Sequence, residues 1–226
     1  MGVHDGHRDR LRDRFREHGL DTFNELNALE LVLFYAIPRR DTNEIAHALL
    51  EHFGSLHAVF EASERELCAV PGVGTQAATL LRLFPQMMRK SACSKANHIR
   101  SIHKSSEAAE YLIPRFLYEQ DEVILLLCLD PQKRIITCAE VGRGVVNASE
   151  TSIRKIVETA LKHRSSSVIL SHNHPNGLAC PSVEDDRMTK QVYRSLTLVG
   201  IPLEDHIIIA GEDYASFRDM GMLTPY

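Results

Sequence analysis

No hydrophobic run in the sequence approaches the roughly 20 residues that a helix needs to cross a bilayer. The first ten residues also lack the apolar core of a signal peptide. The five cysteines are odd in number and no pair forms a Cys-x-x-Cys motif, which argues against a disulfide framework and a cysteine-based zinc site. We therefore expect a protein of the reducing cytoplasm with no membrane association.

A basic excess is also missing from both the N-terminal and the C-terminal part, and the 226-residue chain has a formal net charge of −4. Nucleic-acid-binding domains usually carry a basic face, because neutralising phosphates supplies most of their non-specific affinity. Composition therefore gives no sign of such a domain, although it leaves a local patch open. Hydrophobic residues at 44% and charged residues at 25% are typical of a globular protein, long enough here for one large or two modest domains.

The pattern of apolar residues changes along the chain. Residues 1–90 contain helical spacings and no convincing strand, residues 91–104 are polar and read as a linker, and residues 105–226 alternate between the two kinds of element. In that last part we expect strands at 123–129, 134–140, 167–171, 206–210 and 214–217, and helices at 107–117, 149–163 and 183–199. The sequence thus predicts an α/β domain built on a mixed sheet, preceded by a small all-helical domain.

One stretch, from Ser171 to Asp185, contains the residues most suited to chemistry. His172 and His174 stand two apart, just past the expected end of a strand, so both imidazoles point to the same side. Asp185 falls in the first turn of the following helix. Two imidazoles and one carboxylate are ligands that hold a catalytic zinc while leaving a fourth position open.

Two simpler interpretations compete with a metal site. A His-x-His pair on its own is often a pair of exposed loop histidines. Ser182 and Asp185 also form a helix capping box, which is compatible with a ligand mounted on a rigid helix end. The same donor set suits iron or manganese as well as zinc.

The complete pattern of His-x-His, seven residues and Ser-x-x-Asp resembles the signature of the JAMM (MPN+) zinc hydrolases. The flanking Asn-His-Pro-x-Gly and the upstream residues 140–147 resemble one branch of these, the bacterial RadC family. The resemblance covers essentially the whole chain. It implies a cytidine-deaminase-like JAMM/MPN fold for residues 105–226 and a helix-hairpin-helix in the N-terminal segment.

The resemblance also implies roles for individual residues. His172, His174 and Asp185 would hold one Zn²⁺, Glu140 would be the general base that takes a proton from metal-activated water, and Ser182 would donate a hydrogen bond to the oxyanion. Without the resemblance, nothing distinguishes Glu140 from the other glutamates that we considered, namely Glu150, Glu184 and Glu204.

The sequence departs from the RadC pattern in one loop. Leu178, Ala179 and Cys180 stand where the resemblance predicts a polar stretch, so contacts with substrate are expected to differ there. We interpret Cys180 as a small buried or half-buried thiol. His206 is interpreted as a histidine of the core in preference to a residue that supports the metal ligands. Other zinc signatures, His-Glu-x-x-His and the nucleobase-deaminase motif, are absent from the sequence.

Residues 67–81 match a helix-hairpin-helix. Gly72 and Gly74 permit its tight turn, and Thr75 begins the next helix, so that backbone N–H groups could face a DNA phosphate. The acidic balance of residues 1–90 favours a hairpin that serves packing alone.

Three functions follow in order of preference. The first is a JAMM-type zinc metallopeptidase that cleaves a peptide or isopeptide bond in a peptide or protein substrate. The second is a DNA-associated repair or recombination accessory protein, in which residues 67–81 bind DNA and the metal domain has a supporting role. The third is a metal-bound scaffold without turnover.

Overall fold

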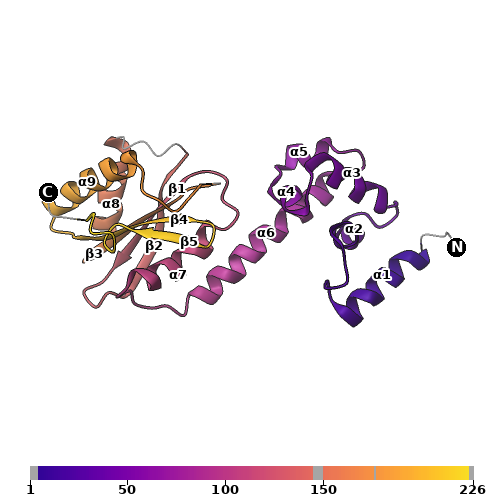
Figure 1. Cartoon of the computed structure of the whole chain (residues 1–226), viewed down its shortest axis with the longest axis horizontal. Coiled ribbons are helices and arrows are strands. Elements are labelled where there is room, and N and C mark those ends of the chain that lie inside the picture. The colour runs from indigo at the N-terminus through magenta and orange to yellow at the C-terminus, as the bar shows by residue number, and fades with distance from the viewer. Residues whose placement is uncertain (1–4, 145–149, 176, 224–226) are drawn as a thin grey trace. The chain divides into compact units, whose positions relative to one another are not determined.

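A computed structural model describes residues 5–144, 150–175 and 177–223 (Figure 1). The chain divides into two compact units, Met1–Met88 and Arg89–Tyr226. No described helix is both long and apolar enough to cross a membrane.

The first unit is helical. Its elements are α1 (Asp5–His18), α2 (Glu25–Ala36), α3 (Asn43–Phe53), α4 (Leu56–Glu61), α5 (Glu64–Ala69) and the first part of α6 (Thr75–Ala96). Leucines at helical spacing form its core, because the apolar side of each helix turns inward. The fully buried leucines are Leu29, Leu33, Leu49, Leu67 and Leu81. A small all-helical region at the N-terminus is therefore confirmed.

A five-stranded mixed sheet forms the centre of the second unit. The strands are β1 (Val123–Leu129), β2 (Ile135–Arg143), β3 (Ser167–Asn173), β4 (Leu203–Ala210) and β5 (Asp213–Ser216), in the order β2-β1-β3-β4-β5. Only β3 and β4 pair in parallel, and the other neighbours are antiparallel. The predicted α/β fold on a mixed sheet is confirmed.

Helices cover both faces of this sheet (Figure 1). The apolar side chains of α8 (Glu150–Lys162) and α9 (Val183–Leu198) pack on one face, and those of α7 (Ser105–Phe116) pack on the other. The inner strand β1 is buried along its whole length, which explains its continuous apolar sequence, Val-Ile-Leu-Leu-Leu-Cys-Leu.

One segment differs from the sequence-based expectation. The segment expected as a linker, 91–104, begins inside α6, which continues to Ala96. Its later part pairs with the start of β2, since the N–H of Ile102 donates to the Lys133 carbonyl at 2.9 Å and the N–H of Ile135 donates to that of Arg100 at 2.9 Å. Ile102 is buried and Ile99 packs beside the same cluster, so this polar segment is anchored by its few apolar side chains.

Candidate metal centre

Strand β3 and the residue after it position both histidines. His172 lies within β3, where it pairs with Ile124 of β1 and Ile208 of β4, so the expectation that it lies past the strand end is wrong. The strand continues because paired strands on both sides satisfy its backbone. His172 is on the same face as Leu170, whose side chain packs against α8 and α9. The imidazole therefore lies inside the protein, below α9.

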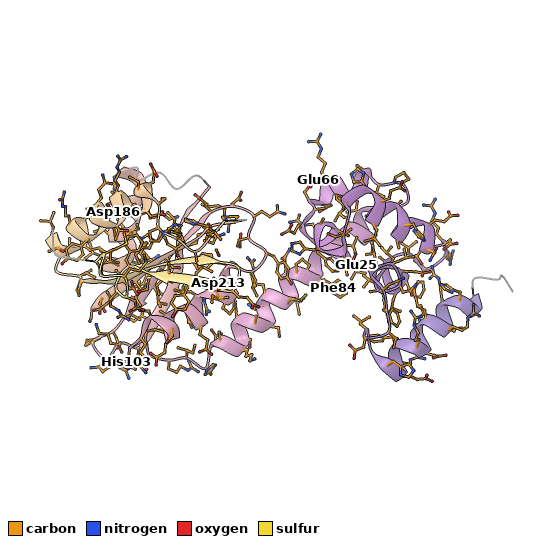
Figure 2. The ribbon with its side chains drawn as sticks, viewed as in Figure 1. Glu25, Glu66, Phe84, His103, Asp186 and Asp213 are labelled. Carbon is orange, nitrogen blue, oxygen red and sulfur yellow. The ribbon has the colours of Figure 1, made fainter. Side chains whose placement is uncertain are left out.

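The first turn of α9 supplies the carboxylate. Ser182 caps the helix, because its Oγ accepts the Asp185 N–H at 3.1 Å. In return, Oδ2 of Asp185 accepts the Ser182 N–H at 2.8 Å and the Ser182 hydroxyl at 2.7 Å. Asp186, labelled in Figure 2, marks this turn. The predicted capping box is confirmed, and it holds the buried Asp185 in one orientation.

The three predicted ligands meet at one point. Nε2 of His172 lies 2.9 Å from Nε2 of His174 and 3.0 Å from Oδ1 of Asp185. Nε2 of His174 lies 3.5 Å from Oδ2 of Asp185. One ligand atom from each residue thus falls within 4.8 Å of the other two, which makes the cluster a possible metal site.

The outer nitrogens of both rings have partners as well. Nδ1 of His174 lies 3.0 Å from the carbonyl oxygen of Leu178, which can only accept, so Nδ1 carries the hydrogen and Nε2 has a free lone pair. Nδ1 of His172 lies 2.9 Å from Nε2 of His206. Metal-binding histidines typically donate their second N–H in this way. The donor set therefore fits a divalent cation such as zinc, and equally iron or manganese.

Charge in the cluster is set by burial and hydrogen bonding. Burial opposes ionisation of Asp185, but hydrogen bonds from His172 and Ser182 and the charge of His172 outweigh it and hold the pKa of this carboxyl well below its usual range. Burial keeps the pKa of His206 well below its ordinary value, aided by the neighbouring His172. The site thus combines an ionised carboxylate with a neutral supporting imidazole.

Ser182 is an exposed residue beside the cluster. Its hydroxyl hydrogen is directed to Oδ2 of Asp185, at 2.7 Å. The role of oxyanion donor stays a prediction for Ser182, and requires that this hydrogen turn towards the substrate.

Glu140 does not join the three ligands. It pairs across β2 with Leu125, which packs towards α7, whereas Ile124, the partner of His172, packs towards α9. Directly opposed residues of antiparallel strands share a face, so the pairing sets Glu140 on the α7 face. Its side chain is 45% exposed and accepts hydrogen bonds from Arg143 at 2.9 and 3.2 Å. The role of general base stays a prediction for Glu140.

Another carboxylate, which sequence reasoning missed, is better placed by the strand register. Glu122 directly precedes β1, is half-buried, and its carbonyl accepts the N–H of Gly144 at 2.8 Å. Because Ile124 pairs with His172 in antiparallel register, continuing by two residues sets Glu122 level with His174. Alternation then places Glu122 on the face of Ile124 and His172. A glutamate before a buried apolar run is a common pattern, so the sequence alone did not single out Glu122 as a candidate base.

The other glutamates considered are less favourably placed. Glu204 lies at the end of β4 remote from His172 and forms an ion pair with Lys133. Glu184 is exposed in the first turn of α9. The side chain of Glu150 lies outside the described residues.

The loop before α9 contributes through its backbone. Leu178 is 81% exposed while its carbonyl accepts from His174, so the unusual residue leaves the support of His174 intact. Cys180 is exposed, and the expectation of a buried or half-buried thiol is wrong.

A mixed sheet covered by helices on both faces, with a His-His-Asp cluster at the end of a central strand, defines a protein with a JAB domain. Residues 102–222 match the family model of the RadC-like JAB domain. The chain is also 33% identical over 225 residues to UPF0758 protein FN0909 of Fusobacterium nucleatum, a match that covers 96% of this chain and 97% of that protein. The chain therefore belongs to the RadC family.

The residues predicted to contact DNA lie in the helical unit. Helix α5 and helix α6 are joined by a tight turn in which Gly72 has a φ of +89°, and both Gly74 and Thr75 are exposed. Glu66, labelled in Figure 2, is part of a capping box that begins α5. DNA binding by this segment stays a prediction.

Proposed function

We propose that the chain is a JAMM-type metal-dependent hydrolase that uses zinc to cleave an amide bond in a peptide or isopeptide linkage. The convergence of Nε2 of His172, Nε2 of His174 and the carboxylate of Asp185 carries this proposal. A divalent ion held there supplies a Lewis acid that activates water and polarises a carbonyl. Three protein donors leave one side of the set for these groups.

The protein's own residues prepare the site for this chemistry. The capping box fixes the Asp185 carboxylate, and the Leu178 carbonyl orients the His174 ring. The β1–β3 register, continued past its last pair of Ile124 and His172, would bring Glu122 level with His174. On this basis the proposal assigns to Glu122 the transfer of a proton from the attacking water to the leaving amine. Glu140 would have to leave Arg143 to do the same, and Glu122 also has an interaction partner of its own.

Purified full-length protein tests the proposal through metal content and cleavage of fluorogenic peptide and lysine-isopeptide pools. We expect wild-type protein to hold one zinc and to cleave, and His172→Ala to lose both properties. Glu122→Gln should keep the metal while cleavage falls roughly 10²–10⁴-fold, the usual contribution of a general base.

The matched variant Glu140→Gln separates the two candidate bases. Wild-type-like cleavage by this variant supports Glu122, whereas a loss at position 140 with activity retained in Glu122→Gln supports Glu140. Stoichiometric zinc in the wild type without cleavage of any pool would contradict the hydrolase and support a metal-bound scaffold.

A further inference from the structure

A second buried histidine stands directly behind the metal ligands. His206 lies on β4 and is fully buried, with its ring stacked on Phe217 at 4.8 Å between centroids and 19° between planes. Its Nε2 is 2.9 Å from Nδ1 of His172. Its Nδ1 is 2.6 Å from Oγ1 of Thr189, a buried residue of α9.

Counting hydrogens gives this chain of contacts a direction. Oγ1 of Thr189 lies 2.5 Å from the Asp185 carbonyl oxygen, which can only accept, so the single hydroxyl hydrogen of Thr189 is donated there. Thr189 is then an acceptor for His206, and the ring hydrogen of a neutral His206 must be on Nδ1. Nε2 of His206 consequently accepts from Nδ1–H of His172.

This series of hydrogen bonds ends at the ring of His172, whose Nε2 is the proposed ligand atom. Without a metal, Nε2 of His172 donates to Asp185, and a metal ion takes the place of that hydrogen. Because His206 holds a hydrogen on Nδ1, His172 can then give the lone pair of Nε2 to an ion between His174 and Asp185. The reverse direction would put a hydrogen on this Nε2 and block the ligand. A histidine retained for core packing alone needs neither Thr189 nor this order.

We propose that His206 and Thr189 are positioning residues that fix the tautomer and the ring orientation of His172 for metal binding. The inference rests on the metal site of the proposed function. It adds that metal affinity depends on a hydroxyl, that of Thr189, which lies two hydrogen bonds away from the nearest ligand ring.

Paired variants of the full-length protein test this series of hydrogen bonds. Thr189→Val removes the hydroxyl at nearly constant shape, and Thr189→Ser keeps it as the matched control. His206→Phe keeps a flat ring to stack on Phe217 but removes both nitrogens. In a zinc titration against a chromophoric chelator, we expect Thr189→Val and His206→Phe to weaken binding about 10–100-fold, with Thr189→Ser within about threefold of wild type.

A tautomer measurement provides a readout that lost packing would not mimic. Long-range ¹⁵N–¹H correlation spectra of ¹⁵N-histidine-labelled, metal-free protein should show the hydrogen of His206 on Nδ1. In Thr189→Val the His206 signals should move towards a mixture of tautomers, while those of Thr189→Ser stay unchanged.

The outcomes separate this inference from the proposed function. Wild-type protein that binds no zinc would overturn the proposed function, and the spectra would still decide the direction of the chain. Wild-type affinity in Thr189→Val, or a hydrogen on Nε2 of His206 in the wild type, would overturn the inference. Thr189→Val decides the question should His206→Phe not fold.

Discussion

Oδ1 of Asn173 accepts the backbone N–H of Val123 at 2.7 Å, while its Nδ2 donates to the carbonyl of Asp121 at 3.0 Å. The side chain between His172 and His174 therefore holds, by hydrogen bonds, the two residues that flank Glu122. Asn173 is buried, so these bonds are shielded from competing water. Residues 172–174 thus contain both histidines of the possible metal site and the side chain that supports the neighbours of Glu122.

Replacing Asn173 should separate cleavage from metal binding. Asn173→Ala leaves a buried N–H and a carbonyl without their partner, which should lower the free energy of unfolding by about 1–3 kcal/mol. Because Glu122 loses its support, we expect cleavage to fall more than zinc affinity. Urea unfolding, zinc titration and cleavage rates measure the three effects, and unchanged cleavage would contradict the arrangement. Asn173→Asp, which keeps the acceptor only, should be intermediate.

Removing the metal should destabilise the second unit. A ligand at one hundred times its dissociation constant stabilises a protein by about 2.7 kcal/mol, which for a chain of this size corresponds to a melting temperature higher by roughly 5–10 °C. We expect a chelator to lower the melting temperature of wild type but not of His174→Ala. His57→Ala, which alters an exposed histidine of the helical unit, is the control and should respond as wild type does.

Acid should remove the contribution of Asp185 to stability. The pKa of this carboxyl is depressed in the folded protein, so its contribution is complete above the ordinary value of about 3.9 and is lost as pH falls below it. In metal-free protein, Asp185→Asn should lower the free energy of unfolding by about 1–3 kcal/mol at pH 6. The difference from wild type should shrink at pH 3. Urea unfolding at both pH values measures it, and a constant difference would refute the assigned shift.

Two glycines of the helical unit offer a matched test of its packing. Gly54 and Gly72 have φ values of +86° and +89°. A Cβ on Gly54 would meet no atom within 4 Å, whereas one on Gly72 would lie 2.9 Å from Cγ1 of the buried Ile45. Gly54→Ala should cost about 1 kcal/mol for backbone strain, and Gly72→Ala about 1–3 kcal/mol more for overpacking.

Urea midpoints of the two glycine variants give this difference. Both positions lie outside residues 102–222, which match the JAB domain, so zinc affinity should stay at the wild-type value in both. Equal midpoints would show that Ile45 moves aside without cost.

Local patterns predicted the elements better than the contacts between them. The apolar run Val123–Leu129 became β1 with the same bounds, because a strand buried on both faces must be apolar throughout. The His-x-His and Ser-x-x-Asp spacing made three residues candidates, and the resemblance to the JAMM signature selected them; the fold gathers these three.

What the sequence could not supply is the register of distant strands. The β1–β2 pairing shifts between Ile124 and Leu125, passing over Val141, and that irregularity decides the face on which Glu140 lies. The support of His172 by His206 likewise depends on the parallel pairing of β3 with β4 and on Thr189 from α9. No local spacing encodes either relationship.

Asp185 takes part in the cluster twice, through its carboxylate and, by way of Thr189 and His206, through its backbone carbonyl. The first turn of α9 is therefore mechanically coupled to both the carboxylate and the His172 ring. A peptide or protein that displaced this turn would loosen two ligands together, and by thermodynamic reciprocity a bound ion would resist that displacement. Metal binding at the cluster and the packing of the first turn of α9 should consequently strengthen each other.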